Sequence, residues 1–525
     1  GRGSQVNAIT APTFEWLQLA PILTVLLAAC IGIGIEAALP RRWRFVSQVL
    51  LFELAIGVAF VLLVMSWLSP KDNLGLMAMD SISLDGPSYL MWGALLVFGL
   101  LSMLVFAERD LNDGASSFAA SAASVPGSVA ETEASLARHE HSEVFPLALF
   151  SLTGMMVFVA ANDLLTAFVA LEVMSLPLYL LSGMARRRRL LSQEAALKYF
   201  LLGALSSAFF LFGMALTYGF TGSFDYGRIS DAIADPVYGR GLLYTGMAFL
   251  AIGLLFKIGA VPFHNWVPDV YVGAPTPVTG FMAICTKLAA VGATVRIFYV
   301  GFGGERWAWQ PLVAVVAVIT MAIGVVVALT QSDMKRLLAY SSISHAGFIL
   351  VAVVGATAGV TGQMNSFGSI LFYLVAYGFA TVAAFAIVTM VRNQAGEVHE
   401  ISGWAGLGRK SPLLAGIFAV LMLSFAGIPL TGGFIGKWAV FSAAWRGGYA
   451  WLVLAAVAFS LVAAYVYLRV IVLMFFAEPA DGVVVGRASG MTWVPVALGA
   501  LASAYLGLFP GPLLDLVTSA STFLR

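Results

Sequence analysis

The chain has 525 residues, of which 60% are hydrophobic and 10% are charged, and its formal net charge is +1. Its mean hydropathy of +0.92 is far above that of soluble globular proteins, in which about a quarter of the residues are charged. The composition therefore predicts an integral membrane protein and excludes a soluble enzyme, and the small net charge excludes nucleic acid as a partner.

Apolar runs of about 20 residues, enough to cross a bilayer core as a helix, recur along the whole chain. Spans of this length favour helices over barrel strands. The predicted fold class is an all-α polytopic membrane protein with about fourteen transmembrane helices. The predicted spans are 15–38, 43–68, 87–108, 143–161, 163–184, 192–219, 241–272, 276–303, 309–331, 335–357, 366–393, 410–446, 447–477 and 491–515.

The loops differ in their content of Lys and Arg. If the loop 40–44 (PRRWR) faces the cytoplasm, the loops on its side hold most of these cations, as the positive-inside rule requires, and both termini are external. The run Arg186 to Arg189 is better explained as a topological anchor than as a lipid or regulatory site. The predicted internal cations are Arg41, Arg42, Arg44, Arg109, Arg138, Arg186, Arg187, Arg188, Arg189, Lys335, Arg336, Arg392, Arg409, Lys410 and Arg487. The external ones are Arg2, Lys71, Arg228, Arg240, Arg306, Arg446 and Arg525.

One segment, 109–142, is hydrophilic and rich in Ala and Ser, and this composition predicts a flexible cytoplasmic linker. Its adjacent His139 and His141 are better explained by chance than by a metal site. Cys30 and Cys285 are too few and too far apart for a zinc or iron–sulfur site, and both are predicted to be small buried hydrophobes. We therefore expect no metal and no redox cofactor in this chain.

The remaining cations lie inside predicted helices, where a charge at the helix centre costs about 2.5–3.5 kcal/mol. Lys198, Arg296 and Arg469 lie near helix ends and are able to snorkel to the interface, which leaves structural and functional roles equally open. Lys257, Lys287 and Lys437 lie deeper, and intramembrane charges of this kind usually mark ion pathways.

Two other ionisable groups are candidates for the same pathway. Glu172 lies inside the apolar run FVALEVMSLPLYLL and needs a partner or a proton. If it pairs with Lys257, a small movement of the carboxylate changes the proton affinity of the lysine. His345, in YSSISHAGF, fits a hydrogen-bonded structural histidine and a proton relay equally well. Glu53 fits a structural ion pair as well as a role in function.

Two apolar segments are interrupted by helix breakers. Prolines at 262, 268, 275 and 277 cannot all lie in one continuous helix. A second break is predicted in SFAGIPLTGGFIGKW, around Pro429 and Gly433. Broken helices at corresponding places in two halves are typical of transporter sites, and here each break has a lysine beside it, Lys257 or Lys437.

The motifs FKIGAVPFHNWVPDVYVGAPTPV, SDMKRLLAYSSISHAGF, FVALEVMSLPLYLLSG and FAGIPLTGGFIGKW resemble those of the antiporter-like membrane subunits of respiratory NADH:quinone oxidoreductase (complex I). The similarity covers about 143–476, and the lysine at 437 is similar to that of the N-type subunits. It implies two inverted five-helix repeats, 143–303 and 309–477, which follow an N-terminal segment 1–108 and the linker 109–142 and precede a C-terminal helix in 478–525.

The resemblance also implies a function and residue roles. Glu172 resembles the family's fifth-helix glutamate, and Lys257 resembles the lysine that pairs with it. Lys287 resembles the lysine that relays protons laterally, and Lys437 resembles the terminal lysine. His345 lies at a position that joins the relay. The implied activity is proton translocation in the bacterial plasma membrane, driven by quinone reduction in partner subunits that carry the flavin, iron–sulfur clusters and quinone. Its implied partners are other membrane and peripheral complex I subunits, including antiporter-like ones, and membrane lipids. The alternative is a subunit of a multisubunit sodium/proton antiporter without redox partners.

Overall fold

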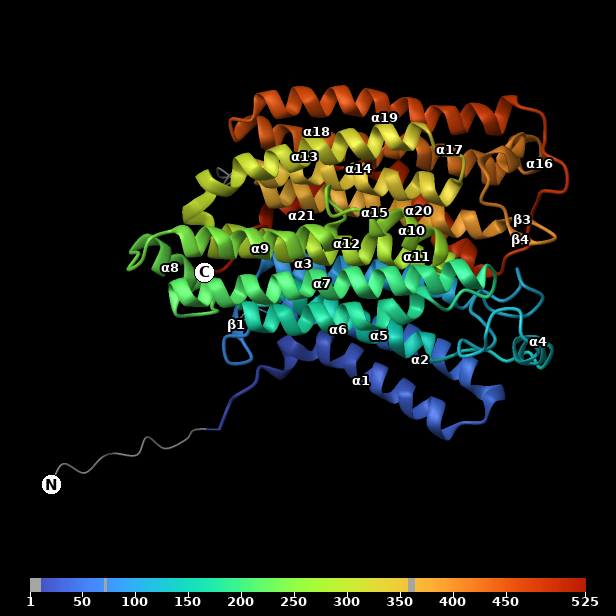
Figure 1. Cartoon of the computed structure of the whole chain (residues 1–525), viewed down its shortest axis with the longest axis horizontal. Coiled ribbons are helices and arrows are strands. Elements are labelled where there is room, and N and C mark those ends of the chain that lie inside the picture. The colour runs from blue at the N-terminus through green and yellow to red at the C-terminus, as the bar shows by residue number, and fades with distance from the viewer. Residues whose placement is uncertain (1–10, 70–72, 357–363) are drawn as a thin grey trace.

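The computed structural model describes residues 11–69, 73–356 and 364–525 and shows a bundle of long helices with nearly parallel axes (Figure 1). In this part of the chain, 12 helices are long and apolar enough to cross a membrane, and α5 (Val144–Ala160) and α17 (Pro412–Ala426) are shorter apolar helices. Within the described residues, each of the fourteen predicted spans corresponds to one continuous helix or to two consecutive helical segments. Arg2 and Lys71, and with them the predicted location of the N-terminus, lie outside the described residues.

The N-terminal part consists of three long helices, one antiparallel hairpin and one short helix. These are α1 (Trp16–Ala38), α2 (Arg41–Trp67), β1 (Gly75–Met77), β2 (Ile82–Leu84), α3 (Gly86–Phe106) and α4 (Val129–Leu136).

Two sets of five spans follow, and the fourth span of each set is broken. The first set contains α5, α6 (Leu164–Ser182), α7 (Arg189–Thr221), the broken pair α9 (Gly241–Ile258) and α10 (Trp266–Gly273), and a continuous span made of α11 (Thr276–Phe281), η1 (Met282–Thr286), α12 (Lys287–Arg296) and η2 (Ile297–Gly301). The second contains α13 (Arg306–Leu329), α14 (Met334–Gly355), α15 (Ser366–Met390), the broken pair α17 and α18 (Gly432–Arg446), and α19 (Ala450–Phe476).

Short elements connect the long helices at the two ends of the bundle. They are α8 (Tyr226–Ala234), η3 (Gly303–Glu305), β3 (Val391–Asn393), β4 (Gly396–Glu397), η4 (Ile401–Trp404), α16 (Leu407–Lys410) and β5 (Val484–Val485). The strands β4, β3 and β5 form a small sheet in that order. The chain ends with α20 (Gly490–Leu508) and α21 (Gly511–Ser519).

The two five-span sets differ in the end of the bundle at which they begin. Figure 1 shows α4, α16, β3 and β4 at one end of the bundle and α8 and β1 at the other. The loop 40–44 lies at the first end, since Arg41 Nη1 is 2.8 Å from His139 Nε2, close to α4, and we call this the Arg-rich end. Helix α5 follows α4 and starts there, whereas α13 follows η3, which contacts α8 at the opposite end. The two sets therefore start at opposite ends of the bundle, an arrangement compatible with inverted repeats.

Both helix breaks occur at glycines whose backbone is left-handed. Helix α9 ends at Gly259 (φ +83°) and α17 ends at Gly427 (φ +77°), and each glycine is followed by a proline within three residues. After the second break the chain returns so closely that a Cβ atom on Gly433 would lie 1.6 Å from the carbonyl oxygen of Ser424. Only glycine fits at that point.

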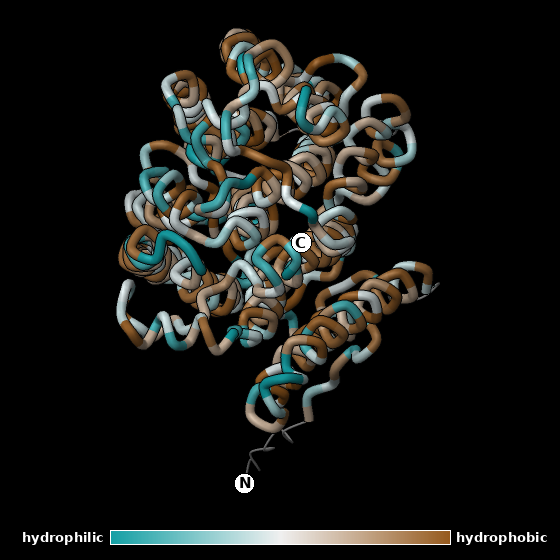
Figure 2. Tube along the Cα trace, turned by 90° about the vertical axis from the view of Figure 1, so that its right-hand side faces the viewer, coloured by the Kyte–Doolittle hydropathy of each residue, from teal (hydrophilic) through white to brown (hydrophobic). Residues whose placement is uncertain are grey.

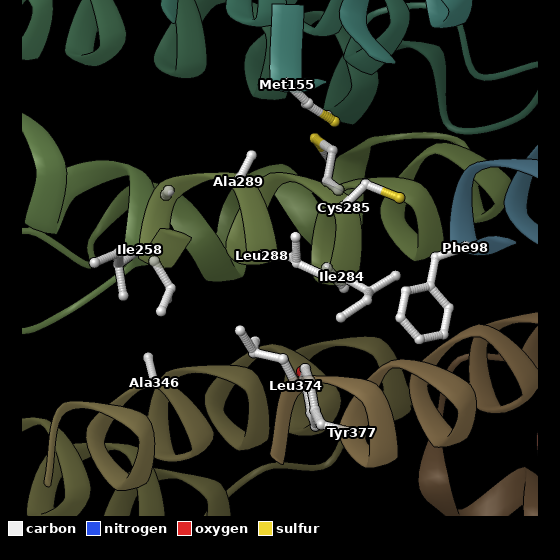
Figure 3. Close-up of a cluster of buried hydrophobic side chains, with 14 of the residues drawn as sticks. Phe98, Met155, Ile258, Ile284, Cys285, Leu288, Ala289, Ala346, Leu374 and Tyr377 are labelled. Carbon is white, nitrogen blue, oxygen red and sulfur yellow. The ribbon is translucent and has the colours of Figure 1, made fainter. Parts of the chain in front are cut away.

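The centre of the bundle is formed by the span 276–301 and by α14 and α15, which are buried along nearly their whole apolar length. Figure 3 shows Ile284 and Leu288 facing Leu374 and Tyr377 across this interface. Cys285 lies beside Met155 there and is fully buried, as predicted for a small hydrophobe. Cys30 was predicted to be buried as well, but it is exposed on α1. Peripheral helices such as α19 and α20 expose apolar side chains, among them Leu461 and Leu501. Figure 2 shows hydrophobic residues, in brown, along the helices of the bundle.

The segment 109–142 differs from the flexible linker that its composition predicts. Phe118 is fully buried, and the amide of Ala119 donates a hydrogen bond of 2.8 Å to the carbonyl oxygen of Met184. Arg189 forms a 3.2 Å ion pair with Glu131 and donates to three carbonyl oxygens of the segment. Backbone carbonyl oxygens and Glu131 of the segment thus bind an arginine of the next loop, a set of contacts that composition alone does not reveal.

The C-terminal part also differs in one detail. The expected helix 491–515 is interrupted after Leu508, and α21 begins only at Gly511. Pro510 and Pro512 explain the interruption, since proline has no amide hydrogen to continue a helix and is favoured in a first turn. The C-terminus lies at the end of the bundle opposite the Arg-rich end (Figure 1).

Candidate functional site

Lys257, Lys287 and Lys437 lie in the interior of the bundle, as the sequence predicted, with exposed fractions of 2%, 3% and 5%. Within the described ranges, none of the three forms an ion pair with a carboxylate. Each ammonium group instead contacts hydroxyl or carbonyl oxygens and one or more aromatic rings.

Lys257 lies in the last turn of α9, next to the first break. Its Nζ atom donates a 3.2 Å hydrogen bond to the hydroxyl of Tyr179 on α6 and lies 5.1 and 5.2 Å from the ring centroids of Tyr179 and Tyr199. Tyr199 stacks on Trp266 of α10 at a centroid distance of 4.6 Å. The first half of the broken helix therefore supplies the cation, and the second half supports the aromatic surroundings.

Glu172 does not form the direct ion pair with Lys257 that the sequence analysis predicted. Among the ion pairs of the described residues none joins the two, and Glu172 Oε1 is buried without a hydrogen-bond partner. The two charges still interact electrostatically. Tyr179 lies two turns after Glu172 on the same face of α6, and its longer side chain reaches the lysine first.

Lys287 lies where the π-helical turn η1 gives way to α12. Its Nζ atom donates to the carbonyl oxygen of Ser342 at 2.5 Å and to the hydroxyl of the same residue at 2.7 Å. The ring of Tyr377 on α15 lies 5.6 Å away. A π-helical turn inside an α-helix is uncommon and frequent at functional sites.

His345 lies one turn after Ser342 on α14 and is 3% exposed. Its Nδ1 atom is hydrogen bonded to the hydroxyl of Tyr373, and its Nε2 atom lies 3.1 Å from the hydroxyl of Tyr467, which also bonds Ser341. Ser342 binds Lys287, and His345 and Lys437 line one small cavity. His345 therefore lies between the two lysines.

Lys437 lies on α18, after the second break. Its Nζ atom donates to the carbonyl oxygen of Ala426 (3.2 Å), at the end of α17, and to the hydroxyl of Ser460 (2.9 Å) on α19. The partial negative charge at the C-terminal end of a helix is a favourable place for an ammonium group. A cavity of about 10 Å³ lies between Lys437 and His345, and it has room for about one water molecule.

The other intramembrane cations have different surroundings. Arg296 does not snorkel: it is 1% exposed and forms two hydrogen bonds, of 2.7 and 2.9 Å, with Asp85 at the start of α3. Lys198 pairs with Asp269 at 2.8 Å, and Arg469 donates to the carbonyl oxygen of Leu329 at 2.7 Å. These contacts indicate anchors between helices.

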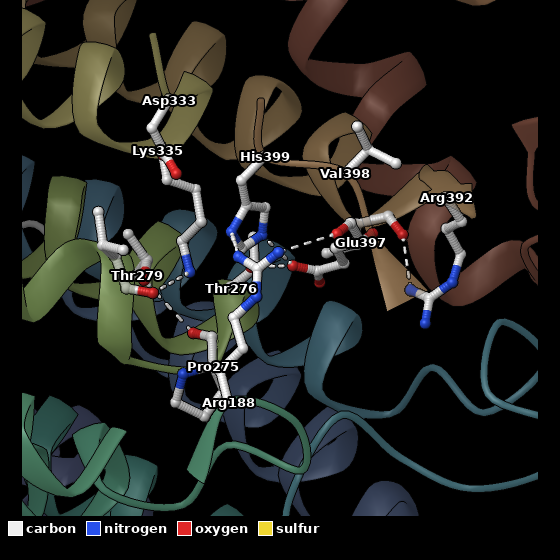
Figure 4. Close-up of polar contacts among 12 residues, drawn as sticks. Arg188, Pro275, Thr276, Thr279, Asp333, Lys335, Arg392, Glu397, Val398 and His399 are labelled. Carbon is white, nitrogen blue, oxygen red and sulfur yellow. Dashed lines mark hydrogen bonds and ion pairs between the residues drawn. The ribbon is translucent and has the colours of Figure 1, made fainter. Parts of the chain in front are cut away.

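Lys335, which the sequence placed among the loop cations, is instead buried (Figure 4). Its Nζ atom donates to the carbonyl oxygens of Val272 (3.2 Å) and Ala274 (2.9 Å), at the C-terminal end of α10. Helix α14 begins at Met334, one residue before the predicted start, and its first turn lies against the end of the broken span. Lys335 therefore holds the second half of that span in place.

A carboxylate of the β3–β4 hairpin completes this polar group (Figure 4). Glu397 accepts hydrogen bonds from Thr276 (2.6 Å) and from Nε2 of His399 (2.8 Å). Arg188 donates to Nδ1 of His399, which leaves the proton of the neutral ring on Nε2. Burial raises the pKa of the Glu397 carboxyl, but the His399 bond, the charge of Lys335 and the Thr276 bond outweigh it and lower the pKa to about 2.

The sequence analysis missed several polar neighbours of the predicted residues. Tyr179 and Ser342 are each predictable in principle, because they lie one or two helical turns from Glu172 and His345 on the same face. Tyr373 and Tyr467 carry no such signal, since each reaches His345 from a different helix. Within the described ranges, no group of three or more His, Cys, Asp or Glu residues is arranged to hold a metal ion.

Comparison with known proteins assigns the family. Residues 161–502 match the family described as "NADH:quinone oxidoreductase/Mrp antiporter, TM". The chain is 52% identical to NADH-quinone oxidoreductase subunit N of Nocardioides sp. over 98% of this chain and 99% of that protein. It is 49% identical to subunit N of Rhodococcus opacus over 99% and 98% of the two chains.

Solved structures show the same fold. A chain of respiratory complex I from Thermus thermophilus with bound aureothin superimposes with a TM-score of 0.76 at 31% identity, and 95% of this chain and 100% of that chain are covered. A chain of the Mrp complex from Dietzia sp. superimposes with a TM-score of 0.79 at 23% identity over 96% of each chain, which shows the fold alone. This chain therefore belongs to the family of antiporter-like membrane subunits of NADH:quinone oxidoreductase and is of the subunit N type.

Proposed function

We propose that this chain translocates protons as a membrane subunit of an NADH:quinone oxidoreductase complex, together with other antiporter-like and peripheral subunits. One observation carries the proposal: three lysines are buried in the bundle without an ion-pair partner among the described residues, and His345 lies one turn from the Ser342 that binds Lys287 and lines a cavity with Lys437. A buried ammonium group that is stabilised only by neutral oxygens and rings is able to lose its proton without leaving a counter-charge unpaired.

The relay that we propose uses Glu172, Lys257, Lys287, His345 and Lys437. Lys257, Lys287 and His345 are hydrogen bonded to hydroxyl groups, which lengthen the proposed path. These are the hydroxyl groups of Tyr179, Ser342, Tyr373 and Tyr467. Moving one charge against 100 mV requires about 2.3 kcal/mol. A hydrogen bond to a charged group contributes about 1.5–3 kcal/mol. The free energy of making or breaking one such bond at a lysine is therefore comparable to the free energy needed to move a proton across this potential.

The energy source in this proposal lies in partner subunits, which carry the flavin, iron–sulfur clusters and quinone. The excess of Lys and Arg at the Arg-rich end supports a bacterial plasma membrane protein with that end in the cytoplasm and both termini external. A sodium/proton antiporter subunit without redox partners is the second candidate. The fold is compatible with an antiporter subunit, but the relative that is 52% identical in sequence favours the oxidoreductase.

The experiment replaces Lys257 with Ala in the chromosomal gene and measures NADH-driven proton uptake in membrane vesicles, with assembly checked on native gels. We expect the loss of proton pumping by this subunit with the complex still assembled, because the Tyr179 bond and the cation disappear together. Lys410→Ala, at the surface of the Arg-rich end, is the control and keeps full pumping. Normal pumping by an assembled Lys257→Ala complex would refute the proposal.

A further inference from the structure

A cleft of about 870 Å³ lies at the Arg-rich end, where α13 ends, α14 begins and α19 ends. Its lining includes polar residues, among them Ser332, Glu400 and Arg469, and apolar residues, among them Leu473 and Phe476. None of these residues belongs to the proposed proton relay. The mixed lining indicates a ligand with a charged part and an apolar part.

Arg469 lines this cleft and has a donor without a partner in the described chain. Its Nη1 atom donates to the carbonyl oxygen of Leu329, while Nη2 is buried and has no hydrogen-bond partner in the described chain. No carboxylate of the described residues lies within ion-pair distance of its guanidinium group. A buried N–H group without a partner is costly, so this geometry favours an acceptor from outside the chain.

Glu400 supplies the opposite charge. Its side chain lines the same cleft and, among the residues that the structure describes, forms no ion pair with Arg469 or with another cation. A cation and an anion thus face one space without neutralising each other. A ligand that carries both charges close together, an anionic group and an ammonium group, is complementary to this pair.

The apolar part of the lining continues onto the outer surface of the bundle. Arg469, Val472, Leu473 and Phe476 share one face of α19, at helical spacings of three and four residues. Val472 is 54% exposed and Phe476 is 79% exposed, which is usual for side chains that face acyl chains. The cleft lies near the end of a membrane-spanning helix, at the depth where lipid headgroups begin.

We propose that this cleft binds a zwitterionic aminophospholipid of the phosphatidylethanolamine class. The lipid phosphate accepts a hydrogen bond from Nη2 of Arg469, its ammonium group pairs with Glu400, and an acyl chain lies along Val472 and Phe476. This site is independent of the proposed function, because no residue of the relay takes part in it.

The test uses the purified complex in nanodiscs made of phosphatidylglycerol. The nanodiscs contain either a phosphatidylethanolamine or a phosphatidylglycerol probe, each with the same photoactivatable diazirine on one acyl chain. After irradiation and proteolysis, mass spectrometry measures the labelling of the peptide that contains 468–476. We expect the phosphatidylethanolamine probe to label this peptide roughly tenfold more than the other probe, the ratio expected from one additional charged contact.

Two variants test the proposed phosphate and ammonium contacts separately. Arg469→Gln and Glu400→Gln should each reduce labelling by the phosphatidylethanolamine probe roughly tenfold. Arg409→Gln is the matched control, since Arg409 lies at the same end in an exposed pair with Glu478 and outside the cleft. Should Arg469→Gln fail to assemble, Glu400→Gln decides alone. Equal labelling by both probes, labelling that neither variant changes, or an unlabelled peptide covered by a partner subunit would each overturn the proposal.

Discussion

Arg296 and the three central lysines show two ways of placing a cation inside a membrane protein. The carboxylate of Asp85 accepts two hydrogen bonds from the guanidinium group of Arg296, so the charge of Arg296 is permanently compensated. Lys257, Lys287 and Lys437 contact neutral oxygens and rings directly, and none of them forms an ion pair within the described residues. Removing one partner of a buried ion pair typically costs about 3–5 kcal/mol. The lysines avoid this penalty when they lose a proton, and this difference separates the proposed relay residues from an anchor.

Removal of the Tyr179 hydroxyl tests whether the neutral groups around Lys257 take part in proton transfer. Tyr179→Phe keeps the ring beside Lys257 and removes only the hydrogen-bond acceptor. We expect the rate of NADH-driven proton translocation to fall roughly tenfold, because a hydrogen bond to a charged group contributes about 1.5–3 kcal/mol. Stopped-flow measurement with a pH-sensitive dye in reconstituted vesicles gives this rate.

Tyr244→Phe is the matched control, because its hydroxyl bonds Glu305 near the opposite end of the bundle, away from the lysines. Its translocation rate should equal that of the unmodified complex. If Tyr179→Phe also pumps at the full rate, the hydroxyl has no part in proton transfer, and Glu172 becomes the partner to test.

Among the elements, the broken helix α17–α18 depends on one glycine. A methyl group at Gly433 would overlap the carbonyl oxygen of Ser424, so Gly433→Ala forces the two half-helices apart and moves Lys437. We expect little or no assembled subunit on native gels. Gly416→Ala, on α17 with nothing within 4 Å of its added Cβ, should assemble normally. Equal assembly of both variants would show that the break tolerates a wider separation.

The β3–β4 hairpin is the second element with a testable role, because Glu397 connects it to Thr276 and His399. The pKa of its carboxyl is lowered from 4.5 to about 2 in the folded chain. A lowered pKa adds stability above the unfolded value, and this contribution disappears as the pH falls towards the folded value. The unfolding temperature of Glu397→Gln should therefore lie below that of the unmodified complex by a constant amount between about pH 5 and 8.

The difference should shrink as the pH falls from about 4.5 towards about 2, because the carboxylate of the unfolded chain then takes up a proton, which stabilises the unfolded state, while the folded carboxylate stays charged. Differential scanning fluorimetry of the detergent-solubilised complex across this range measures it. Glu133→Gln, on the exposed face of α4, is the control and should not differ from the unmodified chain at any pH. A difference that grows on acidification would contradict the assigned direction of the pKa change.

Hydrophobic run length and helix breakers predicted the spans and both breaks, because these features follow from local chemistry. Burial of Lys257, Lys287, Lys437 and His345 was also predictable, since their apolar neighbours in the sequence leave no other place for them. The partners were not predictable in the same way. Tyr467 reaches His345 from a distant helix, and Arg189 orders 109–142 through contacts that only the folded chain creates.

For the whole molecule, the proposed orientation in the membrane is testable by cysteine labelling. Glu133 at the Arg-rich end and Asp235 at the opposite end are both exposed. In a background with Cys30→Ser, a membrane-impermeant maleimide should label Asp235→Cys on intact cells and Glu133→Cys only after permeabilisation. The positive-inside rule gives this direction. The reverse pattern would place the Arg-rich end outside.

The cavity of about 10 Å³ between His345 and Lys437 has a consequence for the membrane as an electrical insulator. Space for about one water molecule does not allow a continuous water wire at this point. Protons therefore cannot flow back here along a file of solvent while the chain has this conformation. A subunit with a large hydrated channel would short-circuit the potential that it helps to build, and the tight packing of aromatic rings around His345 prevents that leak.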